Sequence, residues 1–178
     1  VNTTGANNVA VGKFALLSNT TASDNTAVGF QAGYSNETGT GNVYMGKYYN
    51  IAGNYNVSLG VQSLNSNTAS GNTAVGYQAA YNNTTGTRNT ALGYQTLITA
   101  AGTNSTRNTA LGYQSLFTVN GGYDNTAVGD TSLTALTTGI SNTAVGQEAL
   151  TRATTSSNNT ALGYQSLTYN TTASNNTA

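Results

Sequence analysis

The feature that most constrains this chain is a short motif, N-[TV]-[ASY]-[VLM]-G, which recurs from one end to the other. Successive motif asparagines are 17, 17, 14, 16, 17, 19, 17, 17, 17 and 17 residues apart. Helical repeats need roughly thirty residues or more, and propeller blades more still, so this period is too short for either. The asparagines are Asn8, Asn25, Asn42, Asn56, Asn72, Asn89, Asn108, Asn125, Asn142 and Asn159, with Asn176 opening an incomplete last copy.

Alignment of the copies shows what each position requires. After Asn comes a β-branched residue, then Ala in most copies, then Val, Leu or Met, then an invariant Gly. A looser Y-Q-[AST]-L block and a polar turn complete the repeat, and this pattern predicts a coil with two short strands. Stacked coils pair their backbones at about 4.8 Å. The sequence therefore predicts an all-β, parallel β-solenoid of about ten coils of 14–19 residues, forming one array over residues 1–178.

Side-chain alternation within the motif predicts a partner chain. In N-T-A-V-G the Ala and the aliphatic residue point to opposite faces of the strand. Ala suits a narrow interior, which leaves the larger aliphatic row outside and in need of cover by another chain, most simply in a parallel homotrimer. The alternative places the aliphatic row in the interior and Ala outside, which a monomer tolerates.

The aligned columns also resemble a known family. N-T-A-V-G-Y-Q-A and its variants, from Asn8 to Ala178, are similar to the head repeats of YadA-type trimeric autotransporter adhesins and to related phage tail-fibre arrays. The resemblance implies a left-handed parallel β-roll, trimeric assembly and a role in adhesion or in a fibre. Because the chain begins without Met and stops within a motif, we expect it to be a segment of a longer fibre protein.

Two columns are interpreted as structural. We expect the motif asparagines to form a buried ladder that bonds backbone groups at a turn, in preference to an exposed ligand-binding row. We expect the glycines to mark a corner that needs positive φ or a close backbone approach. They are Gly12, Gly29, Gly46, Gly60, Gly76, Gly93, Gly112, Gly129, Gly146 and Gly163.

Two other columns have alternative functional interpretations. The Thr column is compatible with ice binding, but Val replaces Thr three times, which favours a requirement for β-branched shape. The aromatic column either stacks on sugars or forms a partly exposed ladder that stiffens the rod, and we favour the ladder. Its members proposed for surface contact are Tyr77, Tyr94, Tyr113 and Tyr164.

Composition argues against several functional classes. Charged residues are only 6% of the chain, the net charge is zero, and His and Cys are absent. We therefore expect no nucleic-acid partner, no cofactor, no metal site and no Ser-His or Cys-His catalysis. The longest apolar stretches are far too short for membrane insertion by this segment. Asp130 and Glu148 are the best candidates for a glycosidase pair, because they would be neighbours on adjacent coils.

The sequence thus predicts a non-catalytic structural or adhesive segment of an extracellular fibre on a cell surface or virion. Its expected partners are copies of itself, and a host-surface glycan or protein receptor. The alternatives are a polysaccharide-degrading tail spike and an ice-binding solenoid. One further expectation concerns charge: because Asp24, Arg88, Arg107 and Asp124 each directly precede a motif asparagine, they should lie along one edge of the rod.

Overall fold

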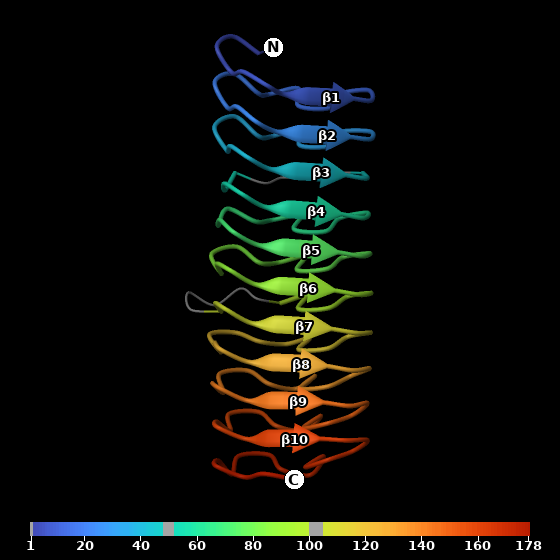
Figure 1. The fold of residues 1–178 in the computed structure, drawn as a ribbon, viewed down its shortest axis with the longest axis vertical. Helices are drawn as coiled ribbons and strands as arrows, with labels where there is room; N and C mark the ends of the chain where they lie inside the picture. Colours follow the sequence, from blue (N-terminus) through green and yellow to red (C-terminus); the bar gives the residue numbers. More distant parts are fainter. Residues whose placement is uncertain (1, 48–51, 100–104) are drawn as a thin grey trace.

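The computed structural model describes residues 2–47, 52–99 and 105–178 and shows one rod of stacked coils with the termini at opposite ends (Figure 1). Each repeat contributes one strand, which begins directly after its motif asparagine, and the strands form one parallel sheet in chain order. The strands are β1 (Val9–Val11), β2 (Thr26–Val28), β3 (Val43–Met45), β4 (Val57–Leu59), β5 (Thr73–Val75), β6 (Thr90–Leu92), β7 (Thr109–Leu111), β8 (Thr126–Val128), β9 (Thr143–Val145) and β10 (Thr160–Leu162).

Neighbouring strands pair residue for residue, so each column of the repeat becomes a row along the rod. Ala127 of β8, for example, lies between Ala110 of β7 and Ala144 of β9. The strands cross the near face from left to right while the chain descends, so the coil is left-handed (Figure 1). The parallel β-solenoid predicted from the repeat is confirmed.

The interior of the rod is narrow and holds mainly small side chains. In β5 and β8 the central Ala is buried, whereas the residues on either side of it are only partly covered. Leucines from the block after the glycine, such as Leu97 and Leu116, fill the rest of the interior. The inward Ala and outward aliphatic residue predicted from alternation are confirmed, and the opposite arrangement is wrong.

One irregular coil shows how closely the interior is filled. Tyr44 replaces the central Ala of β3 and is fully buried, and burial raises the pKa of its hydroxyl. Gly33 occupies the position at which Leu16 and Leu64 lie in other coils. A Cβ on Gly33 would lie 2.7 Å from the Tyr44 ring. The missing leucine side chain therefore makes room for the tyrosine.

The expected second strand is not formed. In the Y-Q-[AST]-L block, residues with left-handed φ alternate with ordinary ones, as in Gln114 (φ 47°) and Leu116 (φ 49°). The direction of hydrogen bonding also changes along the block. The N–H of Gln114 donates to the preceding coil, at Tyr94, and that of Leu116 to the following coil, at Ser132. The block is thus bonded on both sides without being a β-strand.

Candidate functional site

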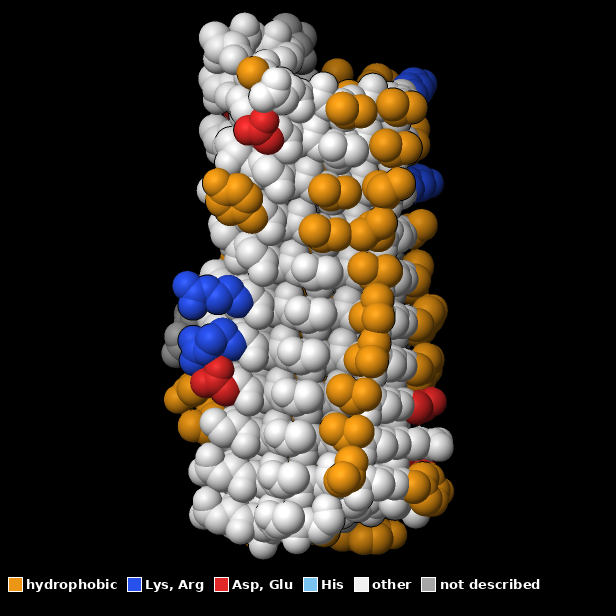
Figure 2. All heavy atoms as spheres, viewed as in Figure 1, with side chains coloured by type: hydrophobic (Ala, Val, Ile, Leu, Met, Phe, Trp, Pro, Cys, Tyr) orange, Lys and Arg blue, Asp and Glu red, His pale blue; other side chains and the backbone are white. Residues whose placement is uncertain are grey.

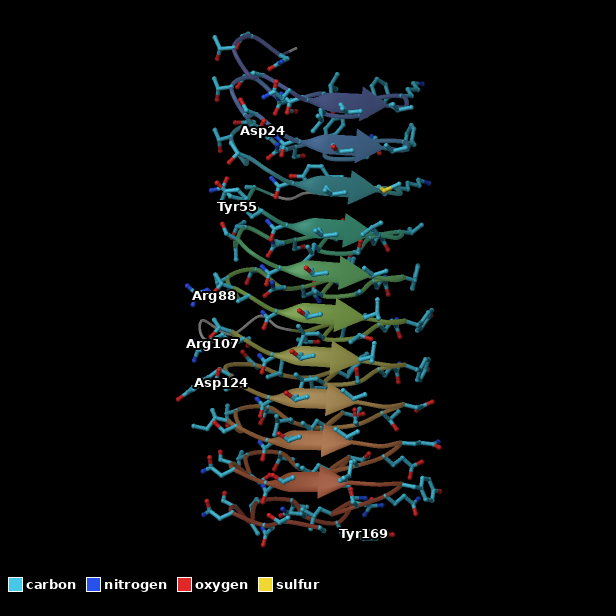
Figure 3. All side chains as sticks on the ribbon, viewed as in Figure 1. Asp24, Tyr55, Arg88, Arg107, Asp124 and Tyr169 are labelled. Carbon is cyan, nitrogen blue, oxygen red and sulfur yellow. The ribbon has the colours of Figure 1, made fainter. Side chains whose placement is uncertain are left out.

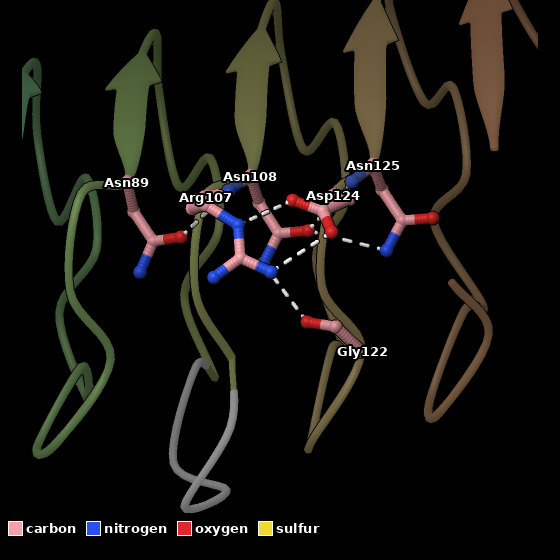
Figure 4. Close-up of polar contacts among 6 residues, drawn as sticks. All are labelled: Asn89, Arg107, Asn108, Gly122, Asp124 and Asn125. Carbon is pink, nitrogen blue, oxygen red and sulfur yellow. Dashed lines mark hydrogen bonds and ion pairs between the residues drawn. The ribbon is translucent and has the colours of Figure 1, made fainter. Parts of the chain in front are cut away.

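The motif asparagines form a continuous ladder within the wall (Figure 4). Asn108 and Asn125 are fully buried. Oδ1 of Asn108 accepts both the backbone N–H and the side-chain amide of Asn125, each at 3.1 Å. Asn125 also donates from Nδ2 to the carbonyl of Gly139 at 2.9 Å. The backbone bond recurs at every step from Asn8 to Asn176, so this column lies inside the wall.

A second asparagine ladder was missed in the sequence. Asn36 and Asn83, each six residues before a motif asparagine, are buried and donate to the carbonyls of Gly39 and Gly86 at 2.9 Å. Those two carbonyls also accept the side-chain amide of the motif asparagine that opens the same repeat, Asn25 or Asn72. The offset of six, shortened to five at Asn67, was a signal that could have revealed this column. In three later coils it is occupied by Val119, Leu136 and Ala153, and in the last coil by Asn170, which donates to the carbonyl of Ala173 at 3.0 Å.

The motif glycines form the corner at which the chain leaves each strand. All ten have φ between 128° and 139°, which side chains with a Cβ rarely adopt. At Gly129 an added Cβ would also collide with the carbonyl group of Gly146 in the next coil. Both the turn and the close stacking of coils therefore require glycine here.

The outer face of the sheet carries an unbroken apolar row (Figure 2). The aliphatic residue of each motif points outward, and Met45 and Leu92 each remain 42% exposed. The Thr or Val residues two positions earlier run beside this row on the same face. Nine coil spacings of about 4.8 Å make the row roughly 43 Å long. Monomeric proteins rarely expose so continuous an apolar surface, so this face is a candidate protein contact.

Tyrosine side chains form a second outer row beyond the glycine corner. Tyr77, Tyr94 and Tyr113 stack with ring centroids 5.2 and 5.6 Å apart. Tyr164 belongs to the same column but is separated from the stack by Asp130 and Gln147. All four tyrosine side chains are substantially exposed, so the row can both stiffen the edge and contact another molecule.

A row of glutamines runs beside the tyrosines and was also missed as a ladder. The side-chain amide of Gln114 donates to Gln95, that of Gln95 to Gln78 and that of Gln78 to Gln62, at 3.0, 2.9 and 3.1 Å. The glutamine that follows the tyrosine in the repeat marks this column in the sequence. The bonds between side-chain amides, however, form only when successive coils stack in register, so the column alone did not reveal a ladder.

The charged residues that precede the motif lie along one edge, as predicted (Figure 3). Arg107 and Asp124 form a bidentate pair, with Nε to Oδ1 at 2.6 Å and Nη2 to Oδ2 at 2.9 Å. This hydrogen bonding lowers the pKa of Asp124 and raises that of Arg107. Arg88 lies one coil before Arg107 on the same edge.

The two carboxylates considered for catalysis lie on adjacent coils. The N–H of Glu148 donates to the carbonyl of Asp130 at 2.9 Å. The Glu148 carboxylate, however, accepts a hydrogen bond from the Gln165 amide at 2.7 Å and so continues the amide row. Across residues 2–47, 52–99 and 105–178, no three His, Cys, Asp or Glu side chains gather into a group that could hold a metal ion.

Comparison with protein-family models, with curated proteins and with solved structures finds no match to this chain. Within the described ranges, the structure contains no helix that is both long and apolar enough to cross a membrane.

Proposed function

We propose that this chain is a rigid structural and adhesive segment of an extracellular fibre, assembled as a parallel homotrimer. The observation that carries the proposal is the outward aliphatic row, which continues through all ten strands without a polar interruption. A thin rod has no second layer of its own to cover this row. Copies of the same chain have the same coil spacing and can therefore cover it along its whole length.

The gain from such cover is large enough to drive assembly. Burying the exposed half of one aliphatic side chain contributes roughly 1 kcal/mol. The row has one such side chain in each of its ten coils, so covering all of them contributes on the order of 10 kcal/mol per chain. Association costs about 4–15 kcal/mol, so the row must be well covered for assembly to be stable. In a trimer around a shared axis both flanks of each row meet a neighbour, whereas a dimer leaves one flank open.

The ladders support a mechanical role. Among the described residues, the hydrogen bonds between coils join each coil to the coils directly before and after it, through backbone, asparagine and glutamine rows. Such an array lengthens by adding coils, each held to its neighbours by the same rows of hydrogen bonds. A segment of this kind holds binding elements away from the surface that carries the fibre.

The proposal is tested by the mass of the protein in solution. Light scattering should give three times the 18.1-kDa mass of the chain. Replacing Leu92 and Leu111 together by Asp should reduce the mass to that of the monomer, because both side chains lie in the outer row. Asn120→Asp, at an exposed turn position, serves as the charge control and should remain trimeric. A wild-type monomer, or an unchanged trimer after the double substitution, would contradict the proposal.

Ice binding is a second candidate because it uses the same face. Thr90, Thr109 and Thr160 are exposed beside the aliphatic row, and paired strands place such threonines at a regular spacing, as Thr90 and Thr109 show. A trimer that covers the row leaves little of this surface for ice. A monomer that shows thermal hysteresis, abolished by Thr109→Lys, would therefore favour ice binding over the fibre.

A further inference from the structure

A groove on the tyrosine edge interrupts the regular rows. It has a volume of about 410 Å³ and is lined by Phe30, Gln31, Lys47, Val61, Gln62 and Tyr77. It arises because Lys47 and Val61 replace the aromatic residue in two successive coils. Phe30 and Tyr77 are thereby left as aromatic walls about 14 Å apart, three coil spacings of about 4.8 Å. Its volume lies within the range of about 300–1,000 Å³ found for small-molecule sites.

The groove also contains hydrogen-bonding groups that the ladder does not use. The glutamine row ends at Gln62, whose Oε1 accepts from Gln78. Within the described residues, neither the Nε2 group of Gln62 nor the amide of Gln31 has a side-chain hydrogen bond. A primary amide can donate and accept at once, so both can bind the hydroxyl groups of one ligand.

Lys47 gives the groove a single positive charge. Its Nζ lies 5.7 Å from the centre of the Phe30 ring, and it forms no ion pair within the described part of the chain. Lys13 lies in the same column two coils earlier, whereas Asp130 and Glu148 lie near the other end of this edge. The basic and acidic side chains of this edge are thus separated along the rod (Figure 2).

From these features we infer that the groove binds a carboxylated saccharide. The Phe30 and Tyr77 rings supply apolar surface for sugar rings, the two amides bind hydroxyl groups, and the Lys47 ammonium, which lies over the Phe30 ring, pairs with the carboxylate. The groove lies beyond the glycine corner from the aliphatic row, so an assembly that covers that row does not require this edge. The inference deepens the adhesive part of the proposed function and rests on it.

The test uses immobilised oligosaccharides that contain sialic or uronic acids, each beside its desialylated or carboxyl-reduced counterpart. The intact protein should bind at least one acidic glycan about tenfold more tightly than its neutral counterpart, the effect of one charge-assisted contact. Lys47→Met should abolish this preference. Tyr77→Ala should weaken binding by about tenfold or more, because it removes one wall. Tyr113→Ala removes an equivalent tyrosine from the regular stack and should leave binding unchanged.

Each alternative result overturns the inference. Binding to no acidic glycan, equal binding of acidic and neutral forms, or retention of the preference by Lys47→Met would exclude the carboxylate contact. An equal loss in Tyr113→Ala would assign binding to the tyrosine row instead of the groove. Light scattering on the same samples separates this failure from that of the proposed function, because a trimer that binds no glycan contradicts only the groove.

Discussion

Substitution of Asn125 by Ala tests the central structural element of the rod. Asn125 lies in the regular coils, where its Oδ1 accepts the backbone N–H and the side-chain amide of Asn142, each at 3.0 Å. Its Nδ2 donates to the carbonyl of Gly139 at 2.9 Å. In this coil the second asparagine column is occupied by Leu136, which cannot replace that donor. The substitution therefore leaves one backbone N–H and one backbone carbonyl without these partners.

The expected loss follows from these two groups. A buried polar group that loses its partner costs about 1–3 kcal/mol, so the two together cost roughly 2–6 kcal/mol. A change of 1 kcal/mol shifts the melting temperature of a chain of this size by about 2–4 °C, which gives a decrease on the order of 10 °C. Because each coil contacts only its neighbours, the loss should be concentrated around β8 and β9.

Thermal melting followed by circular dichroism measures the loss, and amide hydrogen exchange locates it. The matched control is Asn120→Ala: Asn120 is exposed, and among the described residues only its backbone is hydrogen-bonded, to Thr137. The control should melt within about 1 °C of the unsubstituted protein, as surface changes usually do. If Asn125→Ala melted like the control but no longer bound a glycan or cell surface, the asparagine ladder would be a ligand face and the reasoning would be wrong.

Two further predictions concern the irregular coil and the charged edge. Tyr44→Ala should cost about 3–5 kcal/mol as a cavity, and adding Gly33→Leu should recover part of it. A double-mutant cycle with no coupling between the two sites would contradict the compensation between them. Arg107→Gln should raise the pKa of Asp124 towards its ordinary value, since the hydrogen bond from Arg107 lowers that pKa in the folded protein. The stability due to the pair is present above the unfolded pKa of about 3.9 and is lost as pH falls through the folded pKa. An NMR titration in which the pKa of Asp124 stays unchanged would refute this assignment.

The coil and its orientation were predictable because they depend on local chemistry repeated many times. One glycine corner or one Ala between two β-branched residues would indicate little, but a repeat that returns at 17 residues fixes which positions must stack. Alternation along the strand then assigns Ala127 to the interior and Val128 to the outside, as the structure shows. These properties need only strand geometry and in-register stacking.

The second half of each coil was not predictable by the same reasoning. Left-handed φ costs residues with a Cβ roughly 1–2 kcal/mol each, and Gln and Leu are not typical of such positions. At Gln114 and Leu116 the cost is offset by hydrogen bonds to the coils on both sides. Those bonds exist only after the coils have stacked, so the sequence of one coil contains no indication of them. The groove was missed for a related reason, because its walls come from Phe30 and Tyr77, three coils apart.

The difference between the two asparagine columns shows what makes a position in this solenoid indispensable. A motif asparagine accepts a backbone N–H of the next coil, and no apolar side chain can do so. An asparagine of the second column donates to a carbonyl that a motif asparagine already satisfies, as Asn83 does at Gly86, and the backbone N–H that Asn36 accepts comes from its own turn and not from the next coil. Replacing it by Val or Leu therefore leaves that carbonyl bonded and adds apolar contact in the interior. This explains why the first column is unbroken in every copy while the second can be apolar, as at Val119, Leu136 and Ala153, before it returns to asparagine at Asn170.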